Sequence, residues 1–175
     1  VEVSGGFLRD KTVHYFDLLC WLTGEAPIEV YANGACLVDP LIGVAGDVDT
    51  VSVTLKMPSG MLCQIQNGRR SSHGYDERIE VFGALGMLQW NPDVGSTLSR
   101  STESGIMINR PDNGGRYFKQ ESFAAALDAF IKAVQCGDKL EPSLADGVRA
   151  QVIADAATEY LTNQQAVTIS YWEPA

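Results

Sequence analysis

Three ionisable side chains, Asp10, His14 and Asp17, follow one another at intervals of four and three residues near the start of the chain. If this segment is helical, the spacing places all three on one face. The imidazole of histidine gains and loses a proton near neutral pH, and a neighbouring carboxylate can orient the ring and stabilise its protonated form. The spacing therefore predicts an acid–imidazole–acid array that could move a proton to or from a hydroxyl or carbonyl group.

The surrounding residues predict the helix that must carry this array. The pattern favours a helix over residues 10–23, which ends at Gly24. Gly5 and Gly6 precede it, and they would allow either close approach of the backbone to a ligand or a tight turn into the helix. The apolar stripe that can be buried on the opposite face consists of Tyr15, Leu18, Leu19 and Leu22. Charged residues are also common on the solvated face of an ordinary amphipathic helix, so the spacing alone leaves both interpretations open.

Charge and composition exclude several functional classes. The chain has 175 residues and a net charge of −9 at pH 7. A nucleic-acid partner requires a basic face, and anionic membrane surfaces attract basic segments, so neither partner is expected. The sequence shows no signal-peptide pattern and no apolar run of about eighteen residues. Neither a signal peptide nor a membrane-spanning segment is therefore expected in this chain.

The cysteines bear on the cellular compartment. The four cysteines are widely separated and form no C-x-x-C pair, and they are Cys20, Cys36, Cys63 and Cys136. We expect reduced, buried thiols of a cytoplasmic protein. With only two histidines in the chain, no metal site is expected.

The remaining sequence predicts strands followed by helices. Alternation with a period of two, interrupted by turn residues, predicts strands over 28–34, 47–57, 61–67, 77–83, 87–90 and 166–170. Two helices are predicted over 123–135, with Ser122 as N-cap, and over 144–162, beginning at Ser143. This order predicts an α+β fold, with helices on one face of a predominantly antiparallel open sheet. The free face of such a sheet meets solvent or pairs with a second subunit, and we expect a homo-oligomer formed through it.

Two further features concern the extent of the chain. No Gly-x-Gly-x-x-Gly motif follows a predicted strand, so no cofactor-binding residues are assigned within it. The chain begins at Val1 and at once enters what reads as the end of a strand. We therefore expect it to be part of a longer protein.

Four groups of residues, spread over nearly the whole chain, carry a resemblance to a known family. They are Ser4-Gly5-Gly6 with Asp10, His14 and Asp17; Gly46-Asp47-Val48-Asp49-Thr50 with Gly60-Met61-Leu62-Cys63; Arg69-Arg70 and residues 74–83 with Gly86-Met87-Leu88; and Pro142-Ser143 with Asp146-Gly147 and Ala154-Asp155-Ala156-Ala157. In this order they resemble the C-terminal domain of the glucose-fructose oxidoreductase/inositol dehydrogenase (Gfo/Idh/MocA) family, closest to its inositol 2-dehydrogenase branch.

The resemblance implies a two-domain dehydrogenase. Residues 1–175 would be its substrate-binding and oligomerisation domain, with the dihydrodipicolinate-reductase-like α+β fold. A Rossmann domain absent from this chain would precede it and bind NAD or NADP. The family's Glu-Lys-Pro motif, whose lysine assists catalysis, would also lie there. The implied reaction is oxidation of a secondary alcohol of a polyol or sugar.

The resemblance also assigns roles to individual residues. His14 matches the family's catalytic acid/base, and Asp10 matches the acid beside it. Asp17 and Tyr75 match residues that contact or support the substrate. Lys11 stands where the inositol branch often carries a small hydroxyl residue, so it is expected either to contact a different substrate or to point to solvent.

A second interpretation stays open from the sequence. The chain could be a ligand-binding or oligomerisation module that keeps the fold without the chemistry. Asp10 and His14 together favour the enzyme, since a module without activity needs neither. Because no side chain accepts a hydride, we expect this chain to be inactive without its cofactor-binding partner domain.

Overall fold

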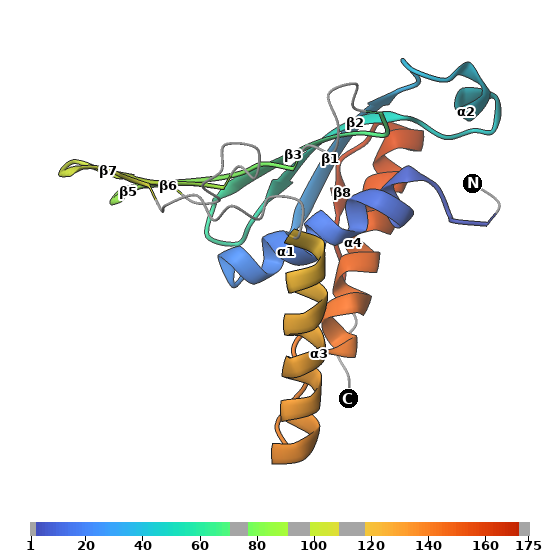
Figure 1. Ribbon diagram of the computed structural model, residues 1–175. Coiled ribbons are helices and arrows are strands. Elements are labelled where there is room, and N and C mark those ends of the chain that lie inside the picture. The colour runs from blue at the N-terminus through green and yellow to red at the C-terminus, as the bar shows by residue number, and fades with distance from the viewer. Residues whose placement is uncertain (1–2, 71–76, 91–98, 109–117, 172–175) are drawn as a thin grey trace. The chain divides into compact units, whose positions relative to one another are not determined.

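The computed structural model describes residues 3–70, 77–90, 99–108 and 118–171 (Figure 1). Contacts within the chain divide it into two compact units. The first unit consists of Val1–Arg70 with Glu141–Ala175, and the second of Ser71–Leu140. Each unit is described by itself below.

The described part of the first unit, residues 3–70 and 141–171, contains four strands and four helical segments. Its helical segments are the π-helix η1 (Leu8–Thr12), α1 (Val13–Thr23), α2 (Pro40–Val44) and α4 (Leu144–Asn163). Its strands are β1 (Glu29–Ala35), β2 (Thr50–Lys56), β3 (Leu62–Gly68) and β8 (Val167–Thr168). They form one antiparallel sheet in the order β3-β2-β1-β8. The strands predicted over 47–57 and 61–67 are confirmed as β2 and β3, which form a hairpin with Lys56 paired to Leu62 across its turn.

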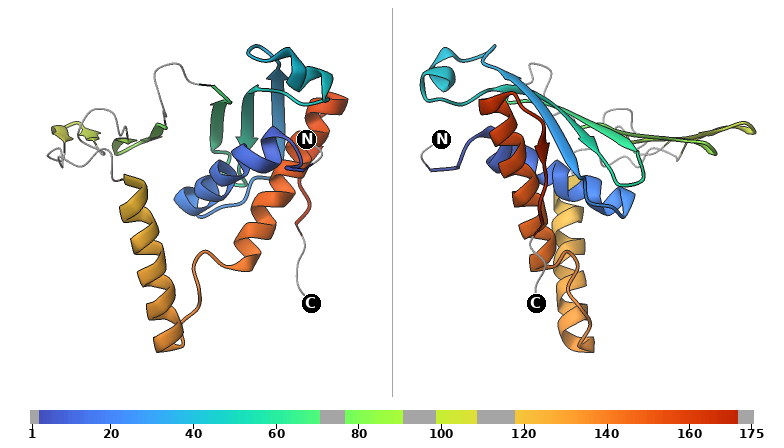
Figure 2. Two further views of the ribbon diagram at one scale, coloured as in Figure 1. Left: turned by 45° about the vertical axis from the view of Figure 1, so that its right-hand side comes forward. Right: turned by 180° about the vertical axis from the view of Figure 1, so that it is seen from behind.

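The helices η1, α1 and α4 cover one face of this sheet (Figure 2). Val51, Val53 and Leu55 alternate along β2 and are all buried beneath the helices, whereas Ser52 between them is exposed. Burial of one strand face and exposure of the other is what the alternation predicts. The arrangement of helices on one face of an antiparallel sheet is therefore confirmed in this unit.

Small residues let α4 lie close to the sheet. Its buried side chains are Ala150, Ile153, Ala154, Ala156 and Ala157. On β1, a Cβ added to Gly34 would come within 2.9 Å of Val48 and 3.2 Å of Leu161, so only glycine fits there. The helix begins at the predicted position, because Ser143 and Asp146 form a capping box.

The buried face of the first helix differs from the predicted one. Its core residues are Leu8, Thr12, Phe16 and Cys20, which repeat every four positions. Tyr15, Leu18 and Leu19 are only partly buried, and Leu22 is 44% exposed. The helix begins earlier than predicted and opens with a π-turn, whose wider i→i+5 hydrogen bonding keeps residues four apart on nearly the same face.

In its described residues, the second unit contains four strands and one helix. Its strands are β4 (Ile79–Gly83), β5 (Gly86–Trp90), β6 (Ser99–Thr102) and β7 (Gly105–Ile108), which form a sheet with antiparallel neighbours in chain order. The helix is α3 (Phe118–Cys136). The predicted N-cap at Ser122 is wrong, because the good helix formers Lys119, Gln120 and Glu121 extend the helix toward the N-terminus. The α+β class is confirmed, with the strands shared between two sheets.

The cysteines follow the prediction in part. All four are free thiols. Cys20 is buried, and burial raises the pKa of its thiol. Cys36 and Cys63 are half-buried, and Cys136 is exposed, contrary to the expectation that all would be buried. Within the described ranges, no helix combines the length and apolar character needed to cross a membrane.

A buried carboxylate organises the connection between β1 and β2. Asp49 is fully buried and accepts hydrogen bonds from the backbone N–H groups of Leu37 (2.9 Å), Val38 (2.8 Å) and Asp39 (2.9 Å). The Thr50 hydroxyl donates a further hydrogen bond of 2.8 Å. Burial alone would raise the pKa of the Asp49 carboxyl, but these hydrogen bonds outweigh it and hold the pKa well below its usual range.

We predict that Asp49→Asn lowers the thermal midpoint at about pH 7 by roughly 5–10 °C, because the amide offers one acceptor oxygen to several N–H donors. The folded-state pKa of Asp49 is depressed, so its stabilising contribution is present above the unfolded-state value of about 3.9 and is lost as the pH falls toward the folded value. Differential scanning fluorimetry between about pH 7 and pH 3 should show the two midpoints converging as the pH falls. Glu103→Gln, at an exposed carboxylate, is the control. It should change neither the thermal midpoint at about pH 7 nor the dependence of the midpoint on pH. A constant gap across this pH range would contradict the assignment.

Candidate functional site

The structure places Asp10 and His14 one helical turn apart, with both side chains exposed. Asp10 belongs to η1 and His14 to the first turn of α1. Lys11 is also exposed, and Asp17 is half-buried one turn further along α1. Tyr75 lies outside the described residues. The predicted array therefore stands on the side of the helix that is not packed into the core.

The segment that carries Asp10 and Lys11 is a π-turn. This form of helix is rare in proteins as a whole, but where it occurs it is frequently found at functional sites. The backbone N–H of Asp10 donates a hydrogen bond of 2.9 Å to the carbonyl of Gly6. Thr12 ends the π-turn and is fully buried, and among the described residues its hydroxyl has no hydrogen-bond partner. The helix is thus anchored through one face while the acidic and imidazole side chains project from another.

The two glycines before the helix make a tight turn into it. Gly5 and Gly6 have φ values of +81° and +98°, which side chains rarely tolerate. Next to them, both carboxylate oxygens of Asp47 accept the Phe7 backbone N–H, at 3.1 and 3.0 Å. A Cβ on Gly6 would lie 3.2 Å from Asp47 Oδ1. Of the two roles left open by the sequence, the structure supports the turn.

The side chains of Asp10, His14 and Asp17 lie on the part of the helix surface that is outside the buried core. Within the described ranges, none of the three side chains forms a hydrogen bond or ion pair with another residue. In ligand-free sites, catalytic hydrogen bonds are often formed only when the substrate binds. An exposed carboxylate and an exposed imidazole, one turn apart, can together bind a hydroxyl group and receive its proton.

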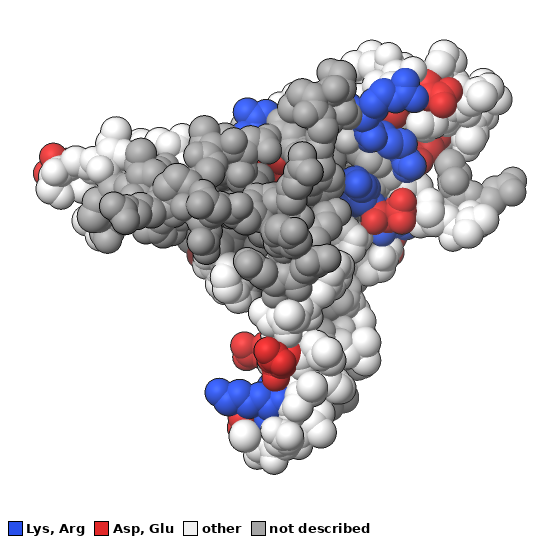
Figure 3. Space-filling view, in the orientation of Figure 1, with Lys and Arg blue, Asp and Glu red and all other residues white. Residues whose placement is uncertain are grey.

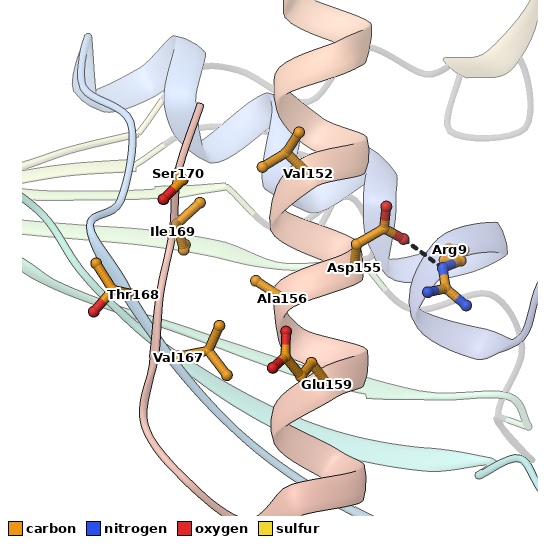
Figure 4. Close-up of a pocket in the computed structure, with 9 residues that line it drawn as sticks. All are labelled: Arg9, Val152, Asp155, Ala156, Glu159, Val167, Thr168, Ile169 and Ser170. Atoms are coloured by element: carbon orange, nitrogen blue, oxygen red, sulfur yellow. Dashed lines mark hydrogen bonds and ion pairs between the residues drawn. The ribbon is translucent and has the colours of Figure 1, made fainter. Parts of the chain in front are cut away.

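A shallow groove lies beside this helix but holds none of the predicted site residues. Figure 4 shows it between α4 and β8, with Arg9 of η1 at its edge. Arg9 Nε forms an ion pair of 2.5 Å with Asp155 of α4. The groove's other lining residues are Val152, Ala156, Glu159, Val167, Thr168, Ile169 and Ser170. The Arg9–Asp155 pair therefore ties the site helix to α4, and sequence reasoning did not foresee it.

The surface charges are mixed. On the face drawn in Figure 3, the coloured Lys and Arg side chains lie near Asp and Glu side chains instead of forming one basic patch. The described residues contain no group of three or more His, Cys, Asp or Glu placed to hold a metal ion. The expectations of no nucleic-acid, membrane or metal partner stay predictions.

Comparison with known proteins gives a consistent result. Residues 1–89 match the family model of the GFO/IDH/MocA C-terminal domain. The chain is 37% identical to the inositol 2-dehydrogenase of Rhizobium meliloti, over 97% of this chain and 52% of that protein. It is 38% identical to the myo-inositol 2-dehydrogenase of Thermotoga maritima, over 97% of this chain and 51% of that protein. The chain thus spans about half the length of these curated relatives.

Solved structures show the same similarity. The fold matches a probable dehydrogenase from Thermotoga maritima with a TM-score of 0.80 and 39% identity, over 95% of this chain and 50% of that one. A putative myo-inositol dehydrogenase from Sinorhizobium meliloti 1021 matches with a TM-score of 0.79 and 37% identity, over 95% of this chain and 51% of that one.

The buried hydroxyl of Thr12 yields a prediction about the anchoring of the site helix. Thr12→Val keeps the shape of the side chain and removes a polar atom without a partner among the described residues. The free energy of unfolding should therefore rise by up to about 1 kcal/mol. Thr158→Val is the matched control, since the Thr158 hydroxyl donates a hydrogen bond of 2.7 Å to the Ala154 carbonyl. Loss of this hydroxyl should give no gain in the free energy of unfolding. Urea unfolding of both variants measures this. Destabilisation by Thr12→Val would show that the hydroxyl is satisfied.

Proposed function

This chain belongs to the Gfo/Idh/MocA family of oxidoreductases, and we propose that it is the substrate-binding half of a nicotinamide-dependent dehydrogenase that oxidises a secondary alcohol of a polyol or sugar. The observation that carries the proposal is the exposed pair of Asp10 and His14, one turn apart on a helix whose other face is anchored in the core. An ordinary solvated helix does not need a π-turn at such a pair.

In the proposed mechanism, His14 removes the proton of the substrate hydroxyl. Oxidation of a secondary alcohol releases a proton and a hydride, and imidazole is the side chain best suited to take the proton near neutral pH. Asp10 stabilises the imidazolium that forms, because an adjacent negative charge favours the protonated ring. Asp17 and Lys11 flank the pair, and we propose that they bind neighbouring hydroxyl groups, the carboxylate as acceptor and the ammonium as donor. Tyr75 is kept as a further proposed substrate contact.

The hydride acceptor lies outside this chain. NAD or NADP supplies that chemistry, and the described residues do not fit a dinucleotide, since both sheets are antiparallel and no glycine-rich turn joins a parallel strand to a helix in the described ranges. We propose that a preceding domain binds the cofactor and presents it to the Asp10–His14 face. One relative, from Bacillus subtilis, is named scyllo-inositol 2-dehydrogenase (NAD(+)) and is 31% identical over 50% of this chain.

We propose an inositol-like polyol as the substrate. Several relatives are named as inositol dehydrogenases, including the two that align over 97% of this chain. Lys11 adds a cation beside the proposed base, which favours a substrate with a hydroxyl or anionic group at that position. We also propose a cytoplasmic location, because all four cysteines are free thiols and reduced thiols persist in reducing compartments.

We predict that His14→Ala in the full-length protein lowers kcat for polyol oxidation by about 100-fold or more, the scale on which a general base acts. Polyols and sugars are screened with both cofactors by NAD(P)H absorbance. Glu159→Gln, at an exposed carboxylate outside the array, serves as control and should keep the wild-type rate. A His14→Ala enzyme with full activity would remove His14 from the mechanism.

We propose that the outward face of the β3-β2-β1 sheet joins two copies of the protein. This face carries Ser52 at its centre, paired to Asn33 on one side and Gln66 on the other, and all three are exposed. Uncharged hydroxyl and amide groups can hydrogen-bond to the same surface of a second copy without the desolvation cost of burying charges.

We predict that the protein sediments as a dimer or larger species and that Ser52→Arg weakens this association by about 10-fold or more, because two arginines would face each other across the symmetric contact. Asp138→Arg, an exposed charge change elsewhere, is the control. Sedimentation velocity over a range of concentrations makes the measurement. A wild-type protein that stays monomeric at high concentration would contradict this proposal.

A further inference from the structure

The contact that fixes the start of the site helix comes from a distant part of the chain. The first N–H groups of a helix have no partner within it, and an acidic side chain is favourable there. Asp47, forty residues from Phe7 in sequence, supplies this acceptor with both carboxylate oxygens. We infer that Asp47 is a positioning residue for proton transfer, holding the helix that carries Asp10 and His14; the inference rests on the proposed function.

The segment between this contact and the site has little freedom. Phe7 is fully buried, and Asp10 lies only three residues after it, in the π-turn that begins at Leu8. On the other side, Gly5 and Gly6 turn at positive φ, and a Cβ on Gly6 would lie in tight contact with the Asp47 carboxylate, at 3.2 Å. A shift of Asp47 would therefore move Phe7 and the turn that carries Asp10.

Asp47 is itself held in place. Its backbone N–H donates a hydrogen bond of 3.1 Å to the Ile42 carbonyl. Two residues later, the buried Asp49 secures the loop that follows β1, and the Asp49 carbonyl accepts a hydrogen bond of 2.8 Å from the Arg69 N–H. The Arg69 guanidinium lies 5.3 Å above the centre of the Phe7 ring. Three chain segments thus meet at Phe7. Through Asp47, the position of the site helix is fixed relative to the sheet.

The Arg9–Asp155 pair is a weaker tie. Its side chains are 37% and 52% exposed, and exposed ion pairs contribute little. Asp47 is half-buried and accepts from a backbone group, which has no rotamer freedom of its own. The stronger constraint on the helix is therefore the Asp47 contact.

A positioning role predicts a specific kinetic pattern in the full-length enzyme. Asp47→Ala should lower kcat for polyol oxidation by about 10- to 100-fold, since small misplacement of a reacting group has effects of this size. The KM for the cofactor should change by less than about 2-fold, because the cofactor is bound mainly by another domain. Asp47→Asn keeps an acceptor oxygen for the Phe7 N–H and should restore kcat to within about 3-fold of wild type.

A second pair of variants tests the same contact from the other side. Gly6→Ala should lower kcat, because the new Cβ crowds the Asp47 carboxylate at 3.2 Å and a side chain is strained at φ of +98°. In the double variant Gly6→Ala/Asp47→Ala, the combined loss in kcat should be smaller than the product of the single losses, since both substitutions break one contact. An Asp47→Ala enzyme with a wild-type kcat, or an Asp47→Asn enzyme as impaired as Asp47→Ala, would each overturn the inference.

Hydrogen exchange separates this inference from the proposed function. In Asp47→Ala, amide exchange over residues 8–14 should accelerate by about 10-fold or more while residues 150–157 of α4 keep their protection. If the wild-type protein oxidises no polyol, the proposed function fails, and the exchange result alone decides whether Asp47 holds the helix. If the wild type is active and exchange over 8–14 is unchanged in Asp47→Ala, the inference fails and the proposed function stands.

Discussion

Two carboxylates in one short loop, Asp47 and Asp49, set the geometry on which the rest of the first unit depends. Asp49 is buried and must be fully hydrogen-bonded, and the N–H groups of Leu37, Val38 and Asp39 satisfy it. This rigid loop then presents Asp47 to the Phe7 N–H. A sheet connection and the start of a helix are thereby joined through backbone donors, which gives the helix a defined position relative to the strands.

Packing explains why one face of that helix is available for chemistry. The alanines of α4 and Gly34 on β1 leave room for close contact between helix and sheet. Phe16 and Cys20 fill the remaining space below α1. With the apolar requirement met on this side, Asp10 and His14 project outward without the desolvation cost that a buried carboxylate or imidazolium would carry.

Local rules predicted the elements where local chemistry decides them. Gly24 ends α1 with φ of +69°, and Ser143 begins α4 through its capping box, both as expected from residue type. The prediction failed at Ser122, where a good cap residue lies inside a longer helix, and α2 was missed although Asp39 followed by Pro40 is a helix start signal. The buried stripe of the first helix was only partly predicted, because a π-turn changes the period on which such stripes are inferred.

The sequence by itself determined the chemical groups of the candidate site and their spacing along one helix, since residue type and helical period are local properties. The strands over 47–57 and 61–67 were determined in the same way, through alternation with a period of two. Only the tertiary structure decided how the site helix is held, because the Asp47–Phe7 contact spans 40 positions and the Arg9–Asp155 pair spans 146. Pairs so far apart leave no periodic signal in one sequence, and their side chains are brought together by the packing of distant segments.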